Sequence, residues 1–493
     1  MTLVTRRQLV AQALAGGLVL AGCGAAGSSG TPASTGSTLD STWGDPVGDG
    51  QLRVGPGEAL VTRLELGPRR PITGTLATLG HVTDAHVLDA SSPARVTFLD
   101  RLGSPFQSTF RPQEALTAQV LTGSANALRA LAPDVVIQGG DLIDNDQANE
   151  LTHALAALQG GVVSPGSGRQ GYYGVQLASD TDPFYYRPDI DAPRHPGLLR
   201  AAVQAFRSAG VDRLVHPVLG DHDALVAGEL APTELTRSLA VGNRALWDLP
   251  LGLTLPPGVH AAAVTSPDGP PDPGLVEPFL RRALEGATVR VPADPTRREL
   301  SFAEVISRLQ GPTARLDYVF DVGPGLRVIV LDLVRRGGGS GGLASADQAG
   351  WLAGQLVSAA DRWVIVVSHQ PLESSVGGAA LLTVLDRSPR VIAAINGHTH
   401  RNQIRPRSTA AGGYWLISTA SLIDYPQQAR AIRVHATAGG GLAISTWMLD
   451  HVFPGNLGTI ARELSFLDAQ GGRPEGFPGR REDRNAILYR APP

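Results

Sequence analysis

The sequence predicts a layered α/β fold, and two observations carry this prediction. First, five short apolar runs have the composition of buried strands: TLATLGHV, DVVIQGG, LVHPVLG, WVIVVSH and VIAAING. Second, helix-like stretches lie between or beside these runs, at 114–131, 148–159, 197–209, 345–358 and 376–387. Strands that alternate with helices are typical of sheets covered by helices.

Further strand candidates follow the last of these runs. Residues 414–419, 430–435 and 442–449 contain Tyr, Trp, Ile and Val with period-two stretches, which predicts core strands that close a second sheet. Residues 454–493 hold a short helical stretch and then a Gly/Pro/Arg-rich segment. We expect this last segment to be a C-terminal tail along the surface.

Two insertions interrupt the alternation. Residues 161–196 are rich in Gly, Pro, Ser and Asp, with aromatic and arginine side chains. These side chains could hold a nucleotide or another planar phosphoester, or they could pack the loop against the domain. Residues 225–315 contain Pro-rich turns and two helix-like pieces, 275–285 and 300–309, which is typical of a cap or lid.

Acidic and histidine residues follow the apolar runs in a fixed order. The groups are Asp84-x-His86, Gly140-Asp141, Gly220-Asp221-His222, Ser368-His369 and Gly397-His398-Thr399-His400. Each group is placed at the carboxyl end of a predicted strand, where α/β sheets hold their sites. Within Asp84/His86 and within His398/His400, the spacing predicts two side chains on one side of an extended segment.

The ordered set resembles the calcineurin-like metallophosphoesterase superfamily, whose blocks run D-x-H, G-D-x-x-D, G-N-H-[DE], a lone His and G-H-x-H. The resemblance spans residues 76–400 and is closest to exported bacterial members with long insertions. It implies a four-layer α-β-β-α sandwich of two mixed sheets. Because residues 84 and 400 must meet, we expect one catalytic domain over residues 51–453, with insertions at about 161–196 and 225–315.

The resemblance also implies two metal sites that share one carboxylate. The first ion would be held by Asp84, His86, Asp141 and His400, and the second by Asp141, Asp221, His369 and His398. Mixed imidazole and carboxylate ligands suit Fe, Mn or Zn, as divalent or mixed-valence ions. In the family, the histidine at position 222 faces the substrate and protonates or stabilises the leaving oxygen, and the aspartate at position 144 orients it.

This chemistry predicts a phosphoester hydrolase. Two ions about 3.5–4 Å apart can share a hydroxide that attacks phosphorus in line. The substrate expected is a phosphomonoester or phosphodiester, either a small molecule or a nucleotide, with a small preference for small substrates. The alternative is a catalytically weakened, metal-binding envelope lipoprotein that keeps the fold. A non-ligand histidine paired with a carboxylate, His222 with Asp144, favours the enzyme, because a structural metal site does not need that pair.

Two positions depart from the family pattern. Asp221 stands where the third block has Asn, so two divalent ions would keep about one net positive charge instead of about two. One hypothesis is that this favours a trivalent iron in the second site; the other is that it weakens or alters activity. Asn145 stands where protein serine/threonine phosphatases have Arg, which argues against that class. Asp144 also replaces the tyrosine of purple acid phosphatases.

Other polar residues near the strands have simpler interpretations. His81 and His216 match no family position and are interpreted as core histidines with satisfied hydrogen bonds. Asp223 is expected to cap or orient its loop. Gly140 and Gly397, with Gly139, are expected to serve tight turns at strand ends.

The amino terminus is typical of an export signal. Arg6-Arg7 precede a moderately apolar stretch and then Leu20-Ala21-Gly22-Cys23, so residues 1–23 resemble a twin-arginine signal peptide with a lipobox. Residues 24–50 are expected to be a flexible tether. We therefore expect export to the cell envelope, with lipidation of Cys23 as the only membrane attachment; a secreted protein is the alternative.

Composition excludes some chemistries. The chain has no lysine, so all 42 basic residues are arginines and lysine-based covalent catalysis is excluded. Its net charge is −3, which does not indicate a nucleic-acid-binding surface. The single cysteine rules out an intramolecular disulfide and a multi-thiolate metal site. The expected partner is therefore a small-molecule phosphoester, and the sequence leaves the oligomeric state open.

Overall fold

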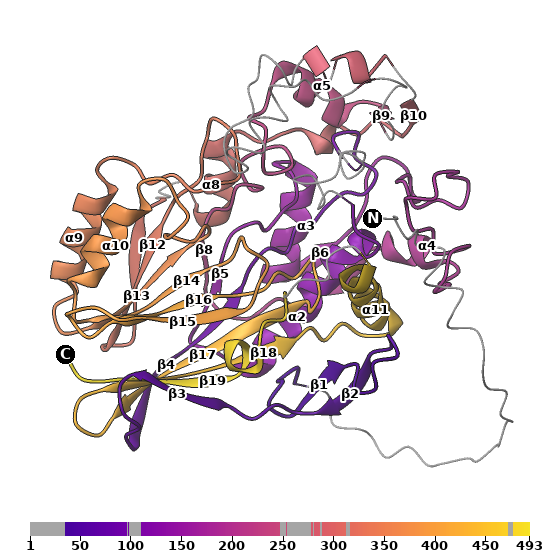
Figure 1. Cartoon of the computed structure of the whole chain (residues 1–493). Coiled ribbons are helices and arrows are strands. Elements are labelled where there is room, and N and C mark those ends of the chain that lie inside the picture. The colour runs from indigo at the N-terminus through magenta and orange to yellow at the C-terminus, as the bar shows by residue number, and fades with distance from the viewer. Residues whose placement is uncertain are drawn as a thin grey trace, which may run out of the picture.

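The computed structural model describes residues 35–95, 97, 110–246, 253, 278–279, 281–285, 288–311, 316–471 and 477–493. The signal peptide predicted for residues 1–23, and the tether as far as residue 34, lie outside this part of the chain. Two facing sheets form the centre, and helices cover both outer faces (Figure 1). The predicted four-layer α-β-β-α sandwich is therefore confirmed.

The first sheet has six strands in the order β11-β12-β13-β14-β16-β15. Its strands are β11 (Tyr318–Val322), β12 (Leu326–Leu331), β13 (Trp363–Ser368), β14 (Val391–Asn396), β15 (Gln403–Arg407) and β16 (Tyr414–Ser418). The four inner strands are parallel to one another, and the two edge strands pair antiparallel. Parallel inner strands bring their carboxyl ends to one edge of the sheet.

The second sheet has seven strands in the order β3-β19-β18-β17-β4-β5-β8. Its strands are β3 (Val61–Leu66), β4 (Ile72–Val82), β5 (Val135–Gln138), β8 (Val215–Pro217), β17 (Gln428–Thr437), β18 (Leu442–Asp450) and β19 (Ala486–Arg490). Strands β4, β5 and β8 are parallel, while β17 and β18 are antiparallel to their neighbours. The late strands predicted from the sequence thus divide between the sheets, β16 in one and β17 and β18 in the other.

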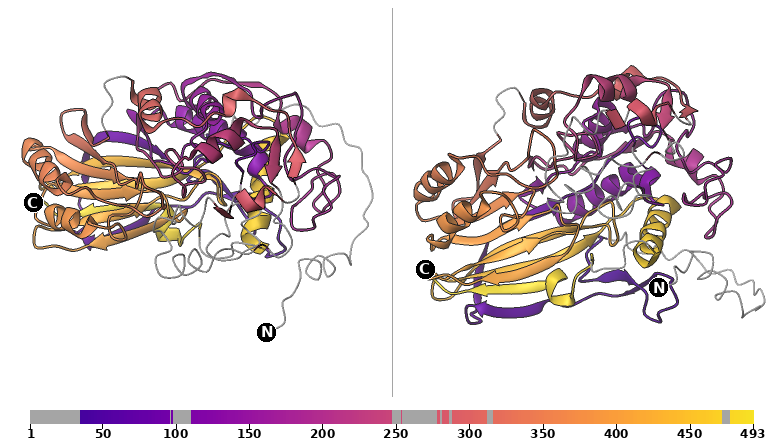
Figure 2. Two further views of the ribbon diagram at one scale, coloured as in Figure 1. Left: turned by 90° about the horizontal axis from the view of Figure 1, so that it is seen from above. Right: turned by 45° about the horizontal axis from the view of Figure 1, so that its top comes forward.

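Three apolar cores hold the layers together. One lies between the sheets and joins residues such as Leu79 and Ile432 to Ile365 and Trp415. A second packs α9 (Gln348–Ser358) and α10 (Gly378–Asp386) on the six-stranded sheet. The third packs α2 (Thr117–Leu131), α3 (Ala148–Gln159) and α11 (Asn456–Gly471) beside the seven-stranded sheet. Figure 2 shows the same layering from two other directions.

The insertions form small elements on one side of the sandwich. The first begins with β6 (Gly161–Val163), and the helix predicted at 197–209 divides into α4 (Leu198–Ala202) and β7 (Phe206–Ser208), which pairs with β6. The second contains α5 (Glu234–Val241), β9 (Arg244–Leu246), β10 (Thr288–Arg290) and α8 (Phe302–Gln310). Most of its predicted piece at 275–285 is described, and it includes short helical turns. Figure 1 shows α5, β9 and β10 together at the top of the molecule.

Two boundary predictions need correction. Residues 454–493 are not a surface tail, because β19 is an inner strand between β18 and β3 and its Ala486 and Leu488 are fully buried. The tether predicted to reach residue 50 is also too long, because Ser41–Gly44 (β1) pairs with Arg53–Pro56 (β2). In both segments, polar and glycine-rich neighbours in the sequence obscured a short strand, and β19 also pairs with β3, which lies far away along the chain.

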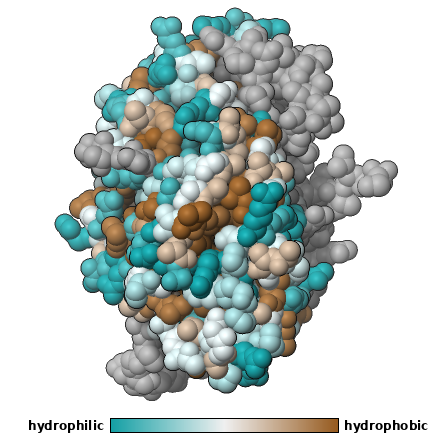
Figure 3. All heavy atoms as spheres, turned by 90° about the vertical axis from the view of Figure 1, so that its left-hand side faces the viewer, coloured by the Kyte–Doolittle hydropathy of each residue, from teal (hydrophilic) through white to brown (hydrophobic). Residues whose placement is uncertain are grey.

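The surface mixes polar and apolar residues. On the face shown in Figure 3, a group of hydrophobic residues is surrounded by hydrophilic ones. Large exposed apolar side chains of the described residues include Leu343, Val357 and Val376. No helix in the described part of the chain has the length and apolar character needed to cross a membrane.

Candidate metal centre

All of the predicted ligands lie just beyond the carboxyl ends of parallel strands. In the seven-stranded sheet, Asp84 and His86 follow β4, Asp141 follows β5, and Asp221 follows β8. In the six-stranded sheet, His369 follows β13, while His398 and His400 follow β14. The two sheets face each other, so their loops meet at one shared edge. The structure thus brings together residues up to 316 positions apart in the sequence, 400 − 84.

One group of converging side chains comprises Asp141, Asp221, His369 and His398, whose ligand atoms lie within 4.8 Å of one another. His369 Nε2 is 3.1 Å from Asp141 Oδ2 and 3.3 Å from Asp221 Oδ1. His398 Nδ1 is also 3.3 Å from Asp221 Oδ1. This is the set that the family resemblance implied for the second ion.

A second group comprises Asp84, His86 and His400. His400 Nε2 is 3.3 Å from Asp84 Oδ1 and 3.3 Å from His86 Nε2. Two imidazole nitrogens that face each other at this distance suit a shared cation, because each can direct its lone pair towards the ion. These are three of the four ligands that the resemblance implied for the first ion.

Asp141 lies between the two groups. Its Oδ2 is 3.1 Å from His369 Nε2 in one group and 3.7 Å from His86 Nε2 in the other. Its Oδ1 accepts a hydrogen bond from the backbone N–H of His222 at 2.9 Å, which fixes the carboxylate. The geometry therefore suits a carboxylate shared by two ions.

The polar atoms of the groups fit bound cations. His369 Nε2 is buried and makes no hydrogen bond among the described residues, although carboxylates surround it. Burial lowers the pKa of His369, but the carboxylates of Asp141, Asp221 and Asp84 outweigh burial and raise that pKa well above its usual value. Likewise, burial lowers but hydrogen bonds to Asp424 and Asp84 raise the pKa of His400, to about 9. Without ions, protons must supply the positive charge that the carboxylates require.

The backbone that carries the ligands is unusual. Asp84, His86, Asp141, His398 and His400 all have left-handed φ values, between 43° and 61°. Non-glycine residues in this region cost about 1–3 kcal/mol each and cluster at functional sites. The prediction that each Asp/His or His/His pair lies on an extended segment is therefore wrong. Asp84 and His86 fall in the same ligand group, whereas His398 and His400 fall in different groups.

Two glycines are required by close contacts. At Gly140 (φ +100°), a Cβ would lie 2.2 Å from His369 Nδ1. At Gly397, a Cβ would lie 2.1 Å from Thr83 Oγ1 and 2.5 Å from Asp84 Oδ2. The sequence assigned both to tight turns. The positive φ of Gly140 agrees in part with a turn. Gly397 is needed for a different reason, because a side chain there would collide with Thr83 and with the predicted ligand Asp84.

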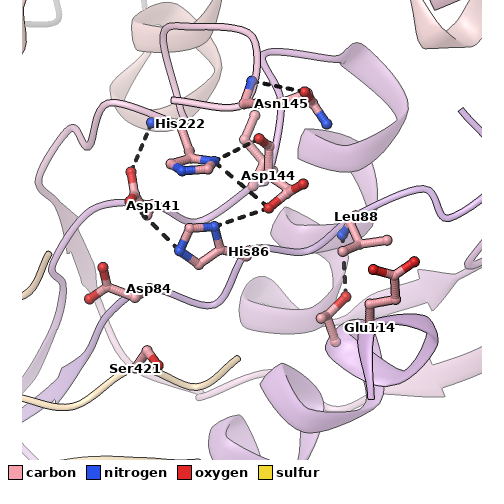
Figure 4. A network of polar contacts seen from close by, with 12 residues as sticks. Asp84, His86, Leu88, Glu114, Asp141, Asp144, Asn145, His222 and Ser421 are labelled. Carbon is pink, nitrogen blue, oxygen red and sulfur yellow. Dashed lines mark hydrogen bonds and ion pairs between the residues drawn. The ribbon is translucent and has the colours of Figure 1, made fainter. Parts of the chain in front are cut away.

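His222 lies beside the two groups described above and belongs to neither; with His86 and Asp144 it forms a third set whose ligand atoms lie within 4.8 Å of one another (Figure 4). Its ring packs edge-on against His86, with centroids 4.4 Å apart. Its Nδ1 is 2.8 Å from the backbone carbonyl oxygen of Asp144 and 3.7 Å from that residue's carboxylate. With Nδ1 engaged by Asp144, Nε2 is the ring nitrogen left to face a substrate.

Asp144 contacts other residues besides His222, the histidine that it was predicted to orient. Its carboxylate is 3.2 Å from His86 Nδ1 and also accepts a hydrogen bond from Arg95, which bonds Glu114 at 2.7 Å. Burial raises the pKa of the Asp144 carboxyl, but Arg95 and the neighbouring histidines lower it below its usual range. Asp144 therefore stays ionised and contacts one predicted ligand and the predicted acid together.

Sequence reasoning missed the residues that support the ligands from behind. Asp424 Oδ2 is 2.6 Å from His400 Nδ1, and its Oδ1 accepts a 2.6 Å hydrogen bond from Arg111. Asp424, Arg111, Arg95 and Glu114 are all buried. None belongs to a motif, so no sequence signal identified them.

His81, His216 and Asp223, which the sequence analysis interpreted as structural residues, have different surroundings in the structure. His81 is fully buried, with Nδ1 2.9 Å from Thr419 Oγ1, but its Nε2 has no hydrogen bond among the described residues, so it is only half satisfied. His216 is only half-buried and stacks on Phe320, with centroids 3.5 Å apart, so it is not a core histidine. Asp223 accepts hydrogen bonds from the backbone N–H groups of Leu142 and Gly220, which confirms that it orients the loops.

The aromatic residues of the first insertion serve packing. Tyr172, Tyr185 and Tyr186 are buried, and Tyr185 and Phe184 stack edge-on in the core next to α2 and α3. Arg187 forms an ion pair with Asp191 in the same loop. Of the two interpretations left open by the sequence, these contacts favour the one in which the loop packs against the domain.

No protein-family model and no curated protein matches the sequence. Among solved structures, the chain is similar to a dimetal phosphatase from Danio rerio, at 14% identity and TM-score 0.39, covering 77% of this chain and 97% of that one. It is also similar to PhoD, at 11% identity and TM-score 0.30, covering 81% and 73%. A third is the Thermus thermophilus sulfate thiohydrolase SoxB, at 14% identity and TM-score 0.30, covering 82% and 61%. TM-scores this low carry no functional argument.

Proposed function

We propose that the protein is a metal-dependent phosphoester hydrolase with two ions. The observation that supports this most directly is the position of Asp141 Oδ2, between His369 of one ligand group and His86 of the other. Two groups that share a carboxylate hold two ions close together, whereas two independent structural sites would not need a shared ligand. When bound, the ions supply an activated water and a clamp for phosphoryl oxygens. Fe, Mn or Zn fits the mixed ligands.

The remaining residues have distinct tasks in this proposal. His222 directs Nε2 towards the substrate and protonates or stabilises the leaving oxygen. The carbonyl oxygen of Asp144 holds His222 through Nδ1. Burial lowers the pKa of His222, while Asp141, Asp144 and Asp221 raise it overall. With ions on Asp141 and Asp221, the carboxylate of Asp144 is the one left to favour the protonated ring that a general acid requires.

For the substrate, we propose a small phosphomonoester or phosphodiester. The net charge of −3 argues against a large polyanion. A nucleotide stays within the proposal, but the packed tyrosines of the first insertion give it no added support.

The test is His222→Ala, compared on two substrates. General acid catalysis contributes about 10²–10⁴-fold, and it matters more when the leaving group is a poor one. We expect the variant to keep two bound ions, measured by mass spectrometry, and to lose more activity on an alkyl phosphate than on p-nitrophenyl phosphate. His435→Ala in β17 is the control, since it removes a buried histidine that hydrogen-bonds Thr75 and Ser445.

Two outcomes would contradict the proposal. Loss of metal together with activity in His222→Ala would mean that this histidine is a ligand. A wild-type protein that holds two ions but hydrolyses neither monoesters nor diesters would support the alternative, a metal-binding envelope protein without turnover.

We also propose that the protein is exported and anchored through Cys23, on the basis of Arg6-Arg7 and the Leu20-Ala21-Gly22-Cys23 segment. Cys23→Ser is expected to move the protein from the membrane fraction to the soluble fraction and to abolish labelling by a fatty-acid probe. An unchanged distribution in that variant would refute the anchor.

A further inference from the structure

Gln370 follows the predicted ligand His369 and contacts a second ligand with its side chain. The residue is only 1% exposed. Its Nε2 donates to Asp221 Oδ1 at 3.0 Å and to the backbone carbonyl oxygen of Ser340 at 3.2 Å. Its Oε1 makes no hydrogen bond among the described residues. The polar contacts of this buried amide therefore come from Nε2, and one of them is to a ligand.

The oxygen that Gln370 contacts is the one that faces the centre. Asp221 Oδ1 is 3.3 Å from both His369 Nε2 and His398 Nδ1. A carboxylate oxygen has two lone pairs, so Oδ1 can accept from an amide and still bind an ion. The contact prevents rotation of the carboxylate away from the histidines.

The amide also suits the unusual residue at position 221. An ionised carboxylate only accepts hydrogen bonds, and a bond from an amide N–H to a charged oxygen is about twice as strong as one between neutral groups. The opposite orientation of the amide would place Oε1 against Asp221 Oδ1, with repulsion between two acceptors. The carboxylate therefore selects one orientation of Gln370, with the donor towards the ligand.

A glycine-rich loop holds Gln370 from the other side. Residues 337–342 have the sequence GGGSGG and follow β12. Ser340 accepts from Gln370 through its carbonyl and donates through Oγ to Glu229 Oε1 at 2.9 Å, and Gly339 N–H donates to the Glu229 carbonyl at 2.8 Å. Glu229 lies in the same loop as Asp221. The hydrogen bonds therefore run from the Asp221 carboxylate through Gln370 and Ser340 and return to the loop that carries Asp221.

We propose that Gln370 is a positioning residue for the second ion: its amide holds Asp221 Oδ1 towards His369 and His398, and residues 337–342 hold the amide. This rests on the proposed function, because it assumes that the Asp221 group binds an ion. Groups that orient ligands in this way contribute about 10–100-fold to metal affinity.

The experiment is titration of the metal-free protein with Mn²⁺ by isothermal calorimetry, which resolves two dissociation constants. We expect Gln370→Leu to weaken one site by about 10–100-fold and to leave the other within about threefold. Gln348→Leu is the matched control, because the Gln348 Nε2 likewise donates to a carboxylate and a carbonyl, those of Asp317 and Asp332, outside the ligand groups. It should change neither constant. Gln370→Met, which keeps the length of the side chain and loses the donor without adding charge, serves if the Leu variant does not fold.

A double-mutant comparison separates positioning from general support of the fold. In an Asp221→Asn background the charge-assisted bond is absent, so Gln370→Leu should weaken the site by less than about threefold. An equal loss in both backgrounds, an equal loss at both sites, or no loss at all would overturn the inference. If wild-type protein binds two Mn²⁺ ions and hydrolyses nothing, the proposed function fails while the role of Gln370 stands. If wild-type protein does not bind two ions, both fail.

Discussion

Asp424 shows, at the scale of single residues, how a side chain outside every motif can control a ligand. Its carboxylate joins His400 Nδ1 to Arg111 and is itself buried. A partner on Nδ1 fixes the tautomer and the ring orientation, so that Nε2 presents its lone pair towards the Asp84 group. Asp424 would therefore act on the proposed first ion through His400.

The Asp424 contact predicts a specific loss of metal affinity. Asp424→Asn keeps the shape and removes the charge, and we expect the affinity of one site for Mn²⁺ to fall by about 10–100-fold with little change in the other. Calorimetric titration checks this. Asp386→Asn is the control, because Asp386 pairs with Arg407 and Tyr414 outside both ligand groups. Equal affinities for wild-type protein and Asp424→Asn would contradict the role.

The sequence predicted the acidic and histidine residues that converge, but not the residues that support them, for a physical reason. A ligand at a strand end is preceded by an apolar run, and that pattern is local. A residue that supports a ligand can be recognised only from the residue it contacts, and Asp424 is 313 residues away from its partner Arg111 in the sequence. The left-handed backbone at Asp84 and His86 was equally hidden, because neither residue type requires it.

At the scale of elements, the second insertion is joined to the loop that follows Asp141. Gln147 and Glu299 form an isolated β-bridge, and Leu300 N–H donates to the carbonyl of Asp146 at 2.7 Å. Glu299 is buried there and accepts from Thr236. Burial, only partly offset by Thr236, raises the pKa of Glu299 from 4.5 to about 7. Burial and Glu299 also raise the pKa of Asp146.

This docking contact predicts a pH dependence of stability. A carboxyl whose pKa is raised on folding binds its proton more tightly in the folded state, so stability is lost as the pH rises from 4.5 towards about 7. Glu299→Gln stays neutral throughout. We expect it to match wild-type protein near pH 4.5 and to exceed its free energy of unfolding by about 1–3 kcal/mol at about pH 8. Denaturant titrations at several pH values measure this, and parallel curves for both proteins would refute it.

Elements were predictable where their apolar pattern was long and unbroken. α2, α3, α9 and α10 lie within the predicted stretches, as do β13 and β14. The stretch at 197–209 does not form one helix, because Phe206 pairs with Val163 in the β6–β7 ladder. Nothing in the local sequence indicates this pairing. Tertiary pairing outweighed the helical preference there.

At the scale of the whole molecule, the two ends of the described chain meet in one sheet. β19, near the C-terminus, pairs with β18 on one side and with β3 on the other. Its Ala486, Leu488 and Tyr489 are buried. Without β19, the first strand of the sheet would have no neighbour.

Truncation after residue 471 is therefore expected to prevent stable folding. Burying one large apolar side chain contributes about 1.5–3 kcal/mol, and a whole protein is stable by only about 5–15 kcal/mol. We expect the truncated protein to be insoluble or to unfold below the temperature of the full chain by more than about 10 °C. Removal of the last two residues, both proline, is the control. A truncated protein with unchanged thermal unfolding would mean that β19 is dispensable.

The ligands come from loops of both sheets, and this division has a mechanical consequence. Under the proposed function, bound ions would cross-link the two sheets, which also pack against each other through an apolar core. Movement of one sheet relative to the other would strain the metal–ligand bonds before it broke the hydrogen bonds between strands. Gentle warming should therefore release ions first, so that inactivation precedes melting and is reversed on cooling in the presence of metal.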